Sequence, residues 1–365
     1  MSLPPVRSRD LGIPFEGTPG AWNAITDVAG CAVGHVTLIS GEGALRVGKG
    51  PVRTGVTAIL PRGQLSTSPC FAGWFPLNGN GEMTGTAWIE ESGLLAGPVL
   101  LTNTHSVGVA RDAVIAWQVR NGRMPGNWSL PVVAETCDGW LNDINGFHVK
   151  ESHVFAALDG AASGPVAEGA VGGGTGMVCH GFKGGIGTAS RMVNAAEQCY
   201  TVGVLVQANH GMRRQLRMAG VPIGLELQDY GKEAVLTDES GSIIIVVATD
   251  APMLPHQLKA MAKRAAMGLA RTGSAAGIGS GDIMLAFSTG NLDGADTGEN
   301  VQATMYGLNR ISALFEAAVQ ATEEAIINAL VAAETMTGVD GRVVHRLPHN
   351  RVIDLMQRSA GSRKT

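Results

Sequence analysis

The sequence predicts a fold that mixes β-strands and α-helices in a single compact domain over residues 1–365. Short apolar runs typical of strands alternate along the chain with segments of helical periodicity, which excludes the all-α and all-β classes. No internal repeat or low-complexity linker divides the chain, and its 365 residues suffice for a substantial core. The 51 glycines, about twice the usual share of roughly 7%, follow no period and predict many tight turns.

The first half of the chain alternates in this way between residues 52 and 206. Residues 52–60 and 97–101 predict strands, because they are rich in β-branched or apolar residues. Residues 108–121 predict a helix, because apolar side chains recur there at helical spacing. Two further strands are expected at residues 131–135 and 202–206.

The alternation continues toward the C-terminus. A fully apolar run follows Ser242 and predicts a buried strand over residues 242–248. Residues 257–271 predict an amphipathic helix, and a strand is expected at 283–287. A long helix is expected over 301–337, where Gly307 is the residue that could interrupt it.

Charge and cysteine content exclude several classes of protein. With a net charge of −4 and no cluster of Lys or Arg, the chain lacks the features of binding to nucleic acid or to an anionic membrane. The five cysteines form no CxxC pair, which supports neither a zinc site nor a disulfide framework and fits a reducing compartment. Residues 1–17 lack the layout of a signal peptide, and the apolar run after Ser242 is far too short to span a bilayer. We therefore expect a cytoplasmic protein.

An acidic, glycine-containing turn at residues 238–241 leads directly into Ser242. By itself, such a turn before a buried strand is ordinary. Cleavage of the Gly241–Ser242 bond, however, would leave Ser242 with both a hydroxyl nucleophile and a base, the freed α-amino group. An α-amino group has an unperturbed pKa of about 7.7–8.0, which suits a general base at neutral pH.

Other familiar motifs do not fit. The glycine-rich segment 172–188 contains Lys183 near a threonine, but this lysine precedes its glycines, so the spacing is not that of a phosphate-binding loop. We interpret the segment as a structural glycine hairpin, or as a wall that lets backbone approach a ligand. His345 and His349 are one helical turn apart, but Pro348 between them breaks a helix, so we expect no metal site. The GxSxG motif of α/β-hydrolases is absent from the sequence.

Two segments carry groups that could assist a nucleophile. Ser280 and Asp282 lie two residues apart in a glycine-rich loop before a predicted strand, where a hydroxyl and a carboxylate could orient an amine or a nucleophile. A turn with a local side-chain bond is the simpler interpretation of that loop. Asn209 ends another predicted strand, and an amide donor at such a place is a component of oxyanion holes.

Four segments occur together and in order, and in combination they resemble the L-aminopeptidase/D-amidase/D-esterase family, which includes the β-peptidyl aminopeptidases: residues 78–85, 172–191, 206–211 and 241–252. The resemblance extends from Asp10 to about Leu355. It implies an α+β fold, a four-layer αββα sandwich like that of N-terminal nucleophile hydrolases but with different connectivity. It further implies a precursor that cuts itself into residues 1–241 and 242–365, and two subunits that stay together.

The resemblance also implies homo-oligomers, often tetramers, and no cofactor or metal. The substrates implied are small peptides, amino-acid amides or esters, from which the N-terminal residue is released. Two other functions remain open. An acyltransferase of the related ornithine acetyltransferase group resembles this architecture, but that group uses Thr as nucleophile and Ser242 argues against it. A non-enzymatic, glycine-rich ligand-binding protein would remain one uncut chain.

Carried over by position, Ser242 is similar to the nucleophile, Ser280 to its hydroxyl partner and Asp282 to the carboxylate behind it. Asn209 is similar to an oxyanion donor. Glu135 resembles the acid that holds the free ammonium of the substrate. A partly buried carboxylate that pairs with an ammonium would reject blocked N-termini, as an aminopeptidase must.

Cys137 is a departure from the family pattern. The family often has Tyr at this position, where the hydroxyl can assist the oxyanion. A thiol is a shorter and weaker donor, so this contribution is reduced. As an independent nucleophile, Cys137 would need a depressed pKa, for which the sequence gives no reason.

Overall fold

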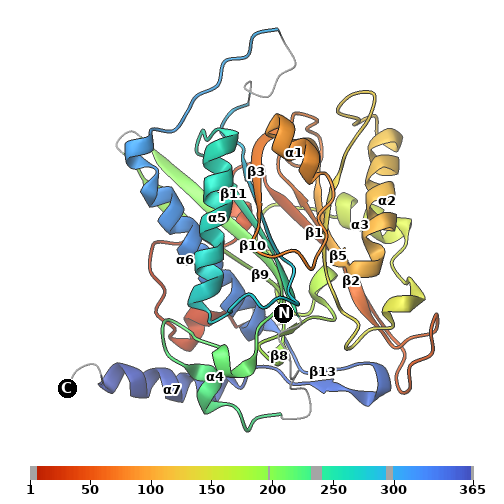
Figure 1. Ribbon diagram of the computed structural model, residues 1–365, viewed down its shortest axis with the longest axis vertical. Helices are drawn as coiled ribbons and strands as arrows, with labels where there is room; N and C mark the ends of the chain where they lie inside the picture. Colours follow the sequence, from red (N-terminus) through yellow and green to blue (C-terminus); the bar gives the residue numbers. More distant parts are fainter. Residues whose placement is uncertain (1–5, 196–197, 232–240, 293–298, 363–365) are drawn as a thin grey trace.

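The computed structural model describes residues 6–195, 198–231, 241–292 and 299–362, and it contains two main β-sheets that are flanked by helices (Figure 1). The four-stranded sheet consists, in spatial order, of β1 (Ala32–Ser40), β2 (Val52–Leu60), β5 (Val99–Asn103) and β6 (Val132–Thr136). The six-stranded sheet consists of β4 (Leu94–Leu95), β3 (Cys70–Pro76), β12 (Asp282–Ser288), β11 (Ser242–Thr249), β10 (Cys199–Asn209) and β9 (Gly185–Asn194). The mixture of strands and helices predicted from the sequence is confirmed.

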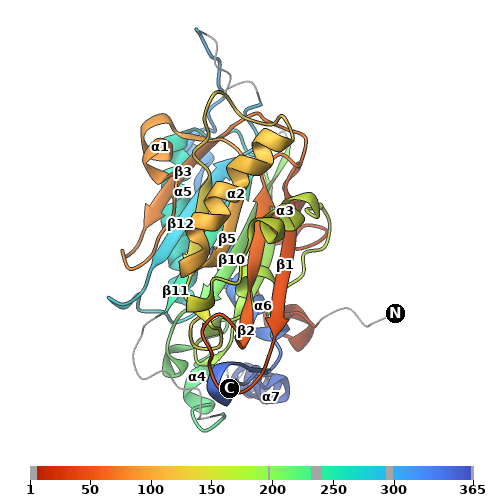
Figure 2. The same cartoon turned by 90° about the vertical axis from the view of Figure 1, so that its right-hand side faces the viewer.

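The helices cover opposite sides of the two sheets, as the two perpendicular views show (Figures 1 and 2). The longer helices are α2 (Val107–Arg120), α3 (Glu151–Asp159), α5 (Pro255–Arg271), α6 (Ser312–Ala332) and α7 (His349–Ser362). The short elements are α1 (Thr86–Ser92), α4 (Ile223–Glu226), β7 (Val178–Cys179), β8 (Phe182–Lys183), β13 (Met336–Thr337) and β14 (Val343–Val344). Within the described ranges, no helix is long and apolar enough to cross a membrane.

Strand β11 explains why the run after Ser242 is apolar at every position. Ile243, Ile245 and Val247 belong to the hydrophobic cluster that contains residues of α5 and α6. Ile244 and Val246 belong to a second cluster, which contains residues of the four-stranded sheet. Both faces of the strand are buried, so the alternation of polar and apolar residues seen in half-exposed strands is absent.

The predicted elements agree with the structure except at the long C-terminal helix. The helix expected over residues 301–337 is wrong in extent, because α6 covers only Ser312–Ala332. Gly307 has extended backbone angles and precedes a single 3₁₀ turn, so the helix begins after it. At the other end Ala333 is extended, and the chain continues into the short strand β13 at Met336–Thr337.

The glycine-rich segment passes between the two sheets. A Cβ on Gly173 would lie 2.1 Å from Oε1 of Gln207 on β10 and 2.7 Å from the carbonyl oxygen of Leu101 on β5. A larger residue would therefore push the sheets apart, which agrees with the interpretation of this segment as a place of close backbone approach.

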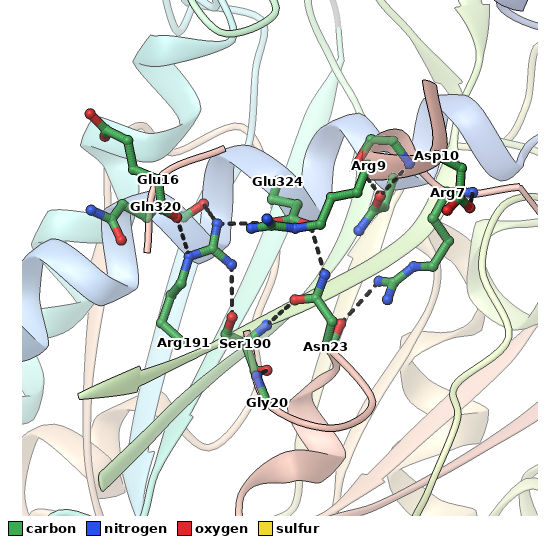
Figure 3. Close-up of polar contacts among 12 residues, drawn as sticks. Arg7, Arg9, Asp10, Glu16, Gly20, Asn23, Ser190, Arg191, Gln320 and Glu324 are labelled. Atoms are coloured by element: carbon green, nitrogen blue, oxygen red, sulfur yellow. Dashed lines mark hydrogen bonds and ion pairs between the residues drawn. The ribbon is translucent and has the colours of Figure 1, made fainter. Parts of the chain in front are cut away.

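A buried polar network joins the N-terminal segment to β9 and α6 (Figure 3). The carboxylate of Glu324 accepts hydrogen bonds from Arg9 at 2.7 and 2.8 Å, from Arg191 at 2.7 Å and from the amide of Asn23 at 2.6 Å. The side chains of Glu324 and Arg191 are 0% and 1% exposed, so their charges depend on one another.

Candidate active site

Ser242 is the first residue of β11, in the middle of the six-stranded sheet, and its neighbours come from the strands on both sides. The antiparallel strand β10 places Asn209 opposite Ser242. The parallel strand β12 places Asp282 opposite Ile243. Asn209, Ser242 and Asp282 are far apart in the sequence, but they therefore meet at the same end of these three neighbouring strands. Ser242 is 7% exposed.

The predicted cleavage position lies at this same end of the strands. Gly241 is buried against the backbone of Asn209 and His210. Residues 238–240 of the predicted turn lie outside the described residues. Ser242 thus marks the point where the chain enters the sheet.

The loop before β12 contacts the Ser242 hydroxyl directly. The backbone N–H of Gly281 donates to Oγ of Ser242 at 3.1 Å. Ser280 donates its hydroxyl to Oδ1 of Asp282 at 2.6 Å, and the N–H of Ile243 donates to the same oxygen at 3.2 Å. The Gly281 donor was not predicted, because a backbone contact of this kind depends on the register of β11 and β12.

Asn78 is a further residue to which the sequence analysis gave no role, although it lies in segment 78–85. Its Nδ2 donates to Oδ2 of Asp282 at 3.1 Å, and its Oδ1 accepts the backbone N–H of Asp282 at 2.6 Å. Asn78 therefore holds Asp282 through both groups of its amide. The two residues are 204 positions apart, and no local sequence pattern indicates such a pair.

The side chain of Asn209 is fixed by two contacts. Its Oδ1 accepts the backbone N–H of Val178 at 2.8 Å, and its Nδ2 donates to the carbonyl of Cys137 at 3.0 Å. Reversal of the amide would place donor against donor at Val178 and acceptor against acceptor at Cys137. Among the residues that the structure describes, the second N–H of Asn209 Nδ2 has no hydrogen-bond partner.

Glu135 is 3% exposed and lies at the end of β6. Its carboxylate accepts hydrogen bonds from the hydroxyl of Thr104 and from the N–H of Glu82, the latter at 3.0 Å. Burial raises the pKa of Glu135, since these donors only partly offset the loss of water. Thr104 was missed, although it directly follows β5, whose end pairs in parallel with β6.

Loop 78–82 joins Glu135 to the surroundings of Ser242. Gly81 packs between Gly281 and Glu135, because a Cβ placed on it would be 3.0 Å from the Cα of Gly281 and 3.5 Å from Oε1 of Glu135. The N–H of Asn80 donates to the carbonyl of Ser280 at 3.2 Å. One short loop thus packs against both the backbone that contacts the Ser242 hydroxyl and the buried carboxylate of Glu135.

Cys137 lies beside Glu135 and is exposed. Its thiol group is nevertheless largely surrounded by protein, and this desolvation is the largest of the effects that raise the pKa of the thiol above the ordinary value. A raised pKa keeps the thiol protonated at neutral pH, and the thiolate is the reactive form. This direction supports the view that Cys137 is not an independent nucleophile.

Among the described residues, one group could approach a metal: Cys179, His180 and His210, whose ligand atoms lie within 4.8 Å of one another. Sγ of Cys179 is 3.8 Å from Nδ1 of His210. Burial raises the pKa of Cys179 to about 12 and lowers the pKa of His210 well below its ordinary value. The thiol of Cys179 therefore stays protonated, and a protonated thiol is a poor metal ligand, whereas the neutral imidazole of His210 is the ligating form of histidine.

The chain is similar to known proteins along most of its length. The model of the family described as peptidase family S58 matches residues 23–344. The chain is 59% identical over 356 residues to the β-peptidyl aminopeptidase BapA of Sphingosinicella microcystinivorans, with 94% of this chain and 90% of that protein covered. It is 50% identical over 372 residues to BapA of Sphingosinicella xenopeptidilytica, with 98% and 92% covered.

A solved structure, the L-aminopeptidase D-Ala-esterase/amidase of Ochrobactrum anthropi, matches with a TM-score of 0.90 and 46% identity over 97% of this chain and 99% of that one. That enzyme is described as a prototype of the serine aminopeptidases and a new variant among the Ntn hydrolase fold. The resemblance inferred from the four sequence segments is confirmed. Matched over most of its length, the chain belongs to peptidase family S58.

Proposed function

We propose that the protein is a self-processing aminopeptidase whose nucleophile is Ser242 after cleavage of the Gly241–Ser242 bond. The observation that carries the proposal is the meeting of Asn209, Gly281 and Asp282 around the start of β11. Its substrates are small peptides, amino-acid amides or esters with a free N-terminus. The names of the two BapA relatives favour N-terminal β-amino acid residues among them.

In the first stage, Oγ of Ser242 attacks the carbonyl carbon of Gly241. The C–N bond breaks, the hydroxyl proton passes to the departing nitrogen, and an ester to Oγ forms. Water then hydrolyses this ester, which leaves a carboxylate on Gly241 and a free α-amino group on Ser242. The hydrogen bond from the Gly281 N–H to Oγ of Ser242 supports this step, because it holds the oxygen in place at the start of β11.

In the second stage, Ser242 attacks the substrate carbonyl with its own amine as base, and water resolves the acyl-enzyme. The remaining N–H of Asn209 is the proposed oxyanion donor. Loss of one such donor typically lowers the rate by about 10²–10³-fold. Ser280 and Asp282 orient the nucleophile, and Glu135 pairs with the substrate ammonium.

The proposal includes an assembly. Residues 1–241 and 242–365 would remain one compact domain, because β10 pairs with β11 and β3 with β12 across the two parts. Arg9 and Arg191 of the first part also bind Glu324 of the second. The order of the helices and sheets, and the described fold of the Ochrobactrum enzyme, favour an αββα sandwich of the N-terminal nucleophile type with different connectivity. We further propose a cytoplasmic homotetramer of such units.

Intact-mass analysis tests the proposal. The wild-type chain should yield two fragments that separate between Gly241 and Ser242, and Ser242→Ala should remain whole. Ser240→Ala is the matched control and should be cut normally. A wild-type chain that stays at 37.7 kDa, or a Ser242→Ala chain that is cut at Gly241, would refute self-processing. Transfer of acetyl from acetylornithine to glutamate by the purified protein would favour the acyltransferase instead.

A further inference from the structure

Lys183 is a buried cation at the centre of the glycine-rich segment, and the proposed mechanism does not use it. Its side chain on β8 is 0% exposed. Nζ donates to the carbonyls of Met177 at 2.8 Å, Gly184 at 2.9 Å and Gly174 at 3.4 Å. A buried ammonium is costly even when its three protons are satisfied, so its presence calls for a physical reason.

The contacts of Met177 connect this lysine to Asn209. The carbonyl of Met177 accepts from Nζ of Lys183 and also from the backbone N–H of Gly184 at 2.9 Å. The N–H of the same peptide unit, that of Val178, donates to Oδ1 of Asn209 at 2.8 Å. A single peptide group therefore separates the cation from the side chain of Asn209.

Hydrogen bonds in such a chain polarise one another. Two donors on the Met177 carbonyl, one of them charged, withdraw electron density from the peptide and make the Val178 N–H a stronger donor. A stronger bond to Oδ1 polarises the Asn209 amide in turn, so its Nδ2 hydrogens become better donors. The same bond prevents the amide from flipping.

We infer that Lys183 is a positioning residue that acts through peptide 177–178 to orient and polarise Asn209 as the oxyanion donor. This inference rests on the proposed function. The charge of Lys183 matters as well as its hydrogen bond, because Asn209 and Val178 are themselves buried and a low-dielectric surrounding strengthens the effect of a cation.

Lys183 is protonated mainly below neutral pH, and the titratable groups around it set that range. Burial lowers the pKa of Lys183 to about 7, and the carboxylate of Asp138 opposes that shift. Asp138 is itself buried, and desolvation raises its pKa to about 6. Asp138 is thus the acidic group that can balance the lysine above that pH.

A double-mutant cycle tests the inference on the mature enzyme, with kcat expressed per cleaved chain. Lys183→Met should lower kcat roughly 10- to 100-fold and change KM less than about two-fold. Asn209→Ala should lower kcat at least as much. If Lys183 acts through Asn209, the double variant should match Asn209→Ala within about two-fold.

Two further variants separate this role from a merely structural one. Thr175→Val removes a buried hydrogen bond to Gly172 in the same segment without touching Asn209, and it should retain wild-type kcat. Lys183→Gln keeps a hydrogen-bond donor but no charge, so its kcat should lie between the values of the wild type and of Lys183→Met.

The outcomes distinguish this inference from the proposed function. A wild-type chain that is neither cut nor active refutes both the proposed function and the inference about Lys183. If the wild type is active, Asn209→Ala has a lowered kcat and Lys183→Met has the wild-type kcat, only the role of Lys183 is overturned. If the reductions in kcat caused by Lys183→Met and Asn209→Ala multiply in the double variant, the role of Lys183 is overturned too. It is also overturned if neither Lys183→Met nor Lys183→Gln folds, because the lysine would then have a structural role alone.

Discussion

The Cα of Gly241 lies so close to the backbone of Asn209 that a Cβ added to it would be 2.1 Å from the Asn209 carbonyl oxygen and 2.8 Å from the Cα of His210. Both atoms belong to the backbone where β10 ends, and Asn209 is paired there with Ser242. They cannot move aside as the end of a flexible side chain can. Only glycine fits at the position before the proposed nucleophile.

We expect Gly241→Ala to displace the start of β11 from β10. Self-cleavage should slow at least about 10-fold, because displacement of reacting atoms by about 1 Å is costly, and stability should fall by about 1–3 kcal/mol through overpacking. Intact mass against time and thermal unfolding measure the two effects. Gly307→Ala is the control, since a Cβ there has open space. Wild-type cleavage by Gly241→Ala would contradict the close approach.

Asn78→Asp should disturb Asp282 without a change in size. The new carboxylate would face Oδ2 of Asp282 where an amide now donates at 3.1 Å. Repulsion between two carboxylates raises the pKa of one of them, so the acid limb of kcat should move to higher pH and kcat should fall about 10-fold. Asn80→Asp adds the same charge at an exposed residue whose amide donates to the Gly279 carbonyl at 2.7 Å rather than to Asp282. Equal pH profiles for the two variants would exclude a specific role for Asn78.

The sequence predicted the residues around Ser242 better than it predicted their contacts. Asn209, Ser280 and Asp282 stood out because polar residues at the ends of apolar strands are visible in the sequence, but their expected roles came from the family resemblance. Their mutual placement needed the strand order, in which β11 pairs antiparallel with β10 and parallel with β12. Periodicity gives the existence of a strand but neither its partner nor its register.

The residues that were missed depend on contacts between distant loops. Asn78 reaches Asp282, and the N–H of Glu82 reaches Glu135, only because loop 78–82 folds over the ends of both sheets. Strand β1 was not predicted either. It is an edge strand whose residues from His35 onward are partly or fully exposed, and His35, Thr37 and Ser40 interrupt its apolar residues.

The ionisation of Glu135 should set the acid limb of the pH profile of kcat/KM. Burial raises its pKa, and the ionised form is the one that binds an ammonium. As the pH falls through this raised pKa, the carboxylate takes up a proton and kcat/KM should fall. In kcat the limb should lie at lower pH, because a bound ammonium stabilises the carboxylate.

Glu135→Gln provides the test of that assignment. It should remove the limb and lower kcat/KM for free amines about 100-fold, the order of magnitude for loss of a buried ion-pair partner. N-acetylated substrates, which the wild type should not cleave, serve as the control. An acid limb that persists unchanged in Glu135→Gln would assign the titration to another group.

Glu324→Gln should destabilise the chain by about 3–5 kcal/mol, because it leaves the buried guanidinium of Arg191 without a counter-charge (Figure 3). Burial alone would raise the pKa of Glu324, but its bonds with Arg9 and Arg191 outweigh burial and lower it. A carboxylate with a lowered pKa in the folded state contributes stability above its unfolded pKa of about 4.3, and this is lost as the pH falls through the folded value.

Urea unfolding of the uncut Ser242→Ala chain, followed from neutral pH down to below pH 4, measures both effects of Glu324→Gln. The variant should lose stability at neutral pH, and its stability should vary less with pH in the acid range. Glu334→Gln is the matched control, because Glu334 pairs with Arg346 on the surface with 73% of its side chain exposed, and its loss should cost at most about 1 kcal/mol. Equal effects of the two substitutions would mean that the buried pair contributes no more than a surface one. In the mature protein, Glu324 and Arg191 would belong to different fragments, so Glu324→Gln should also let the fragments separate at lower urea concentration.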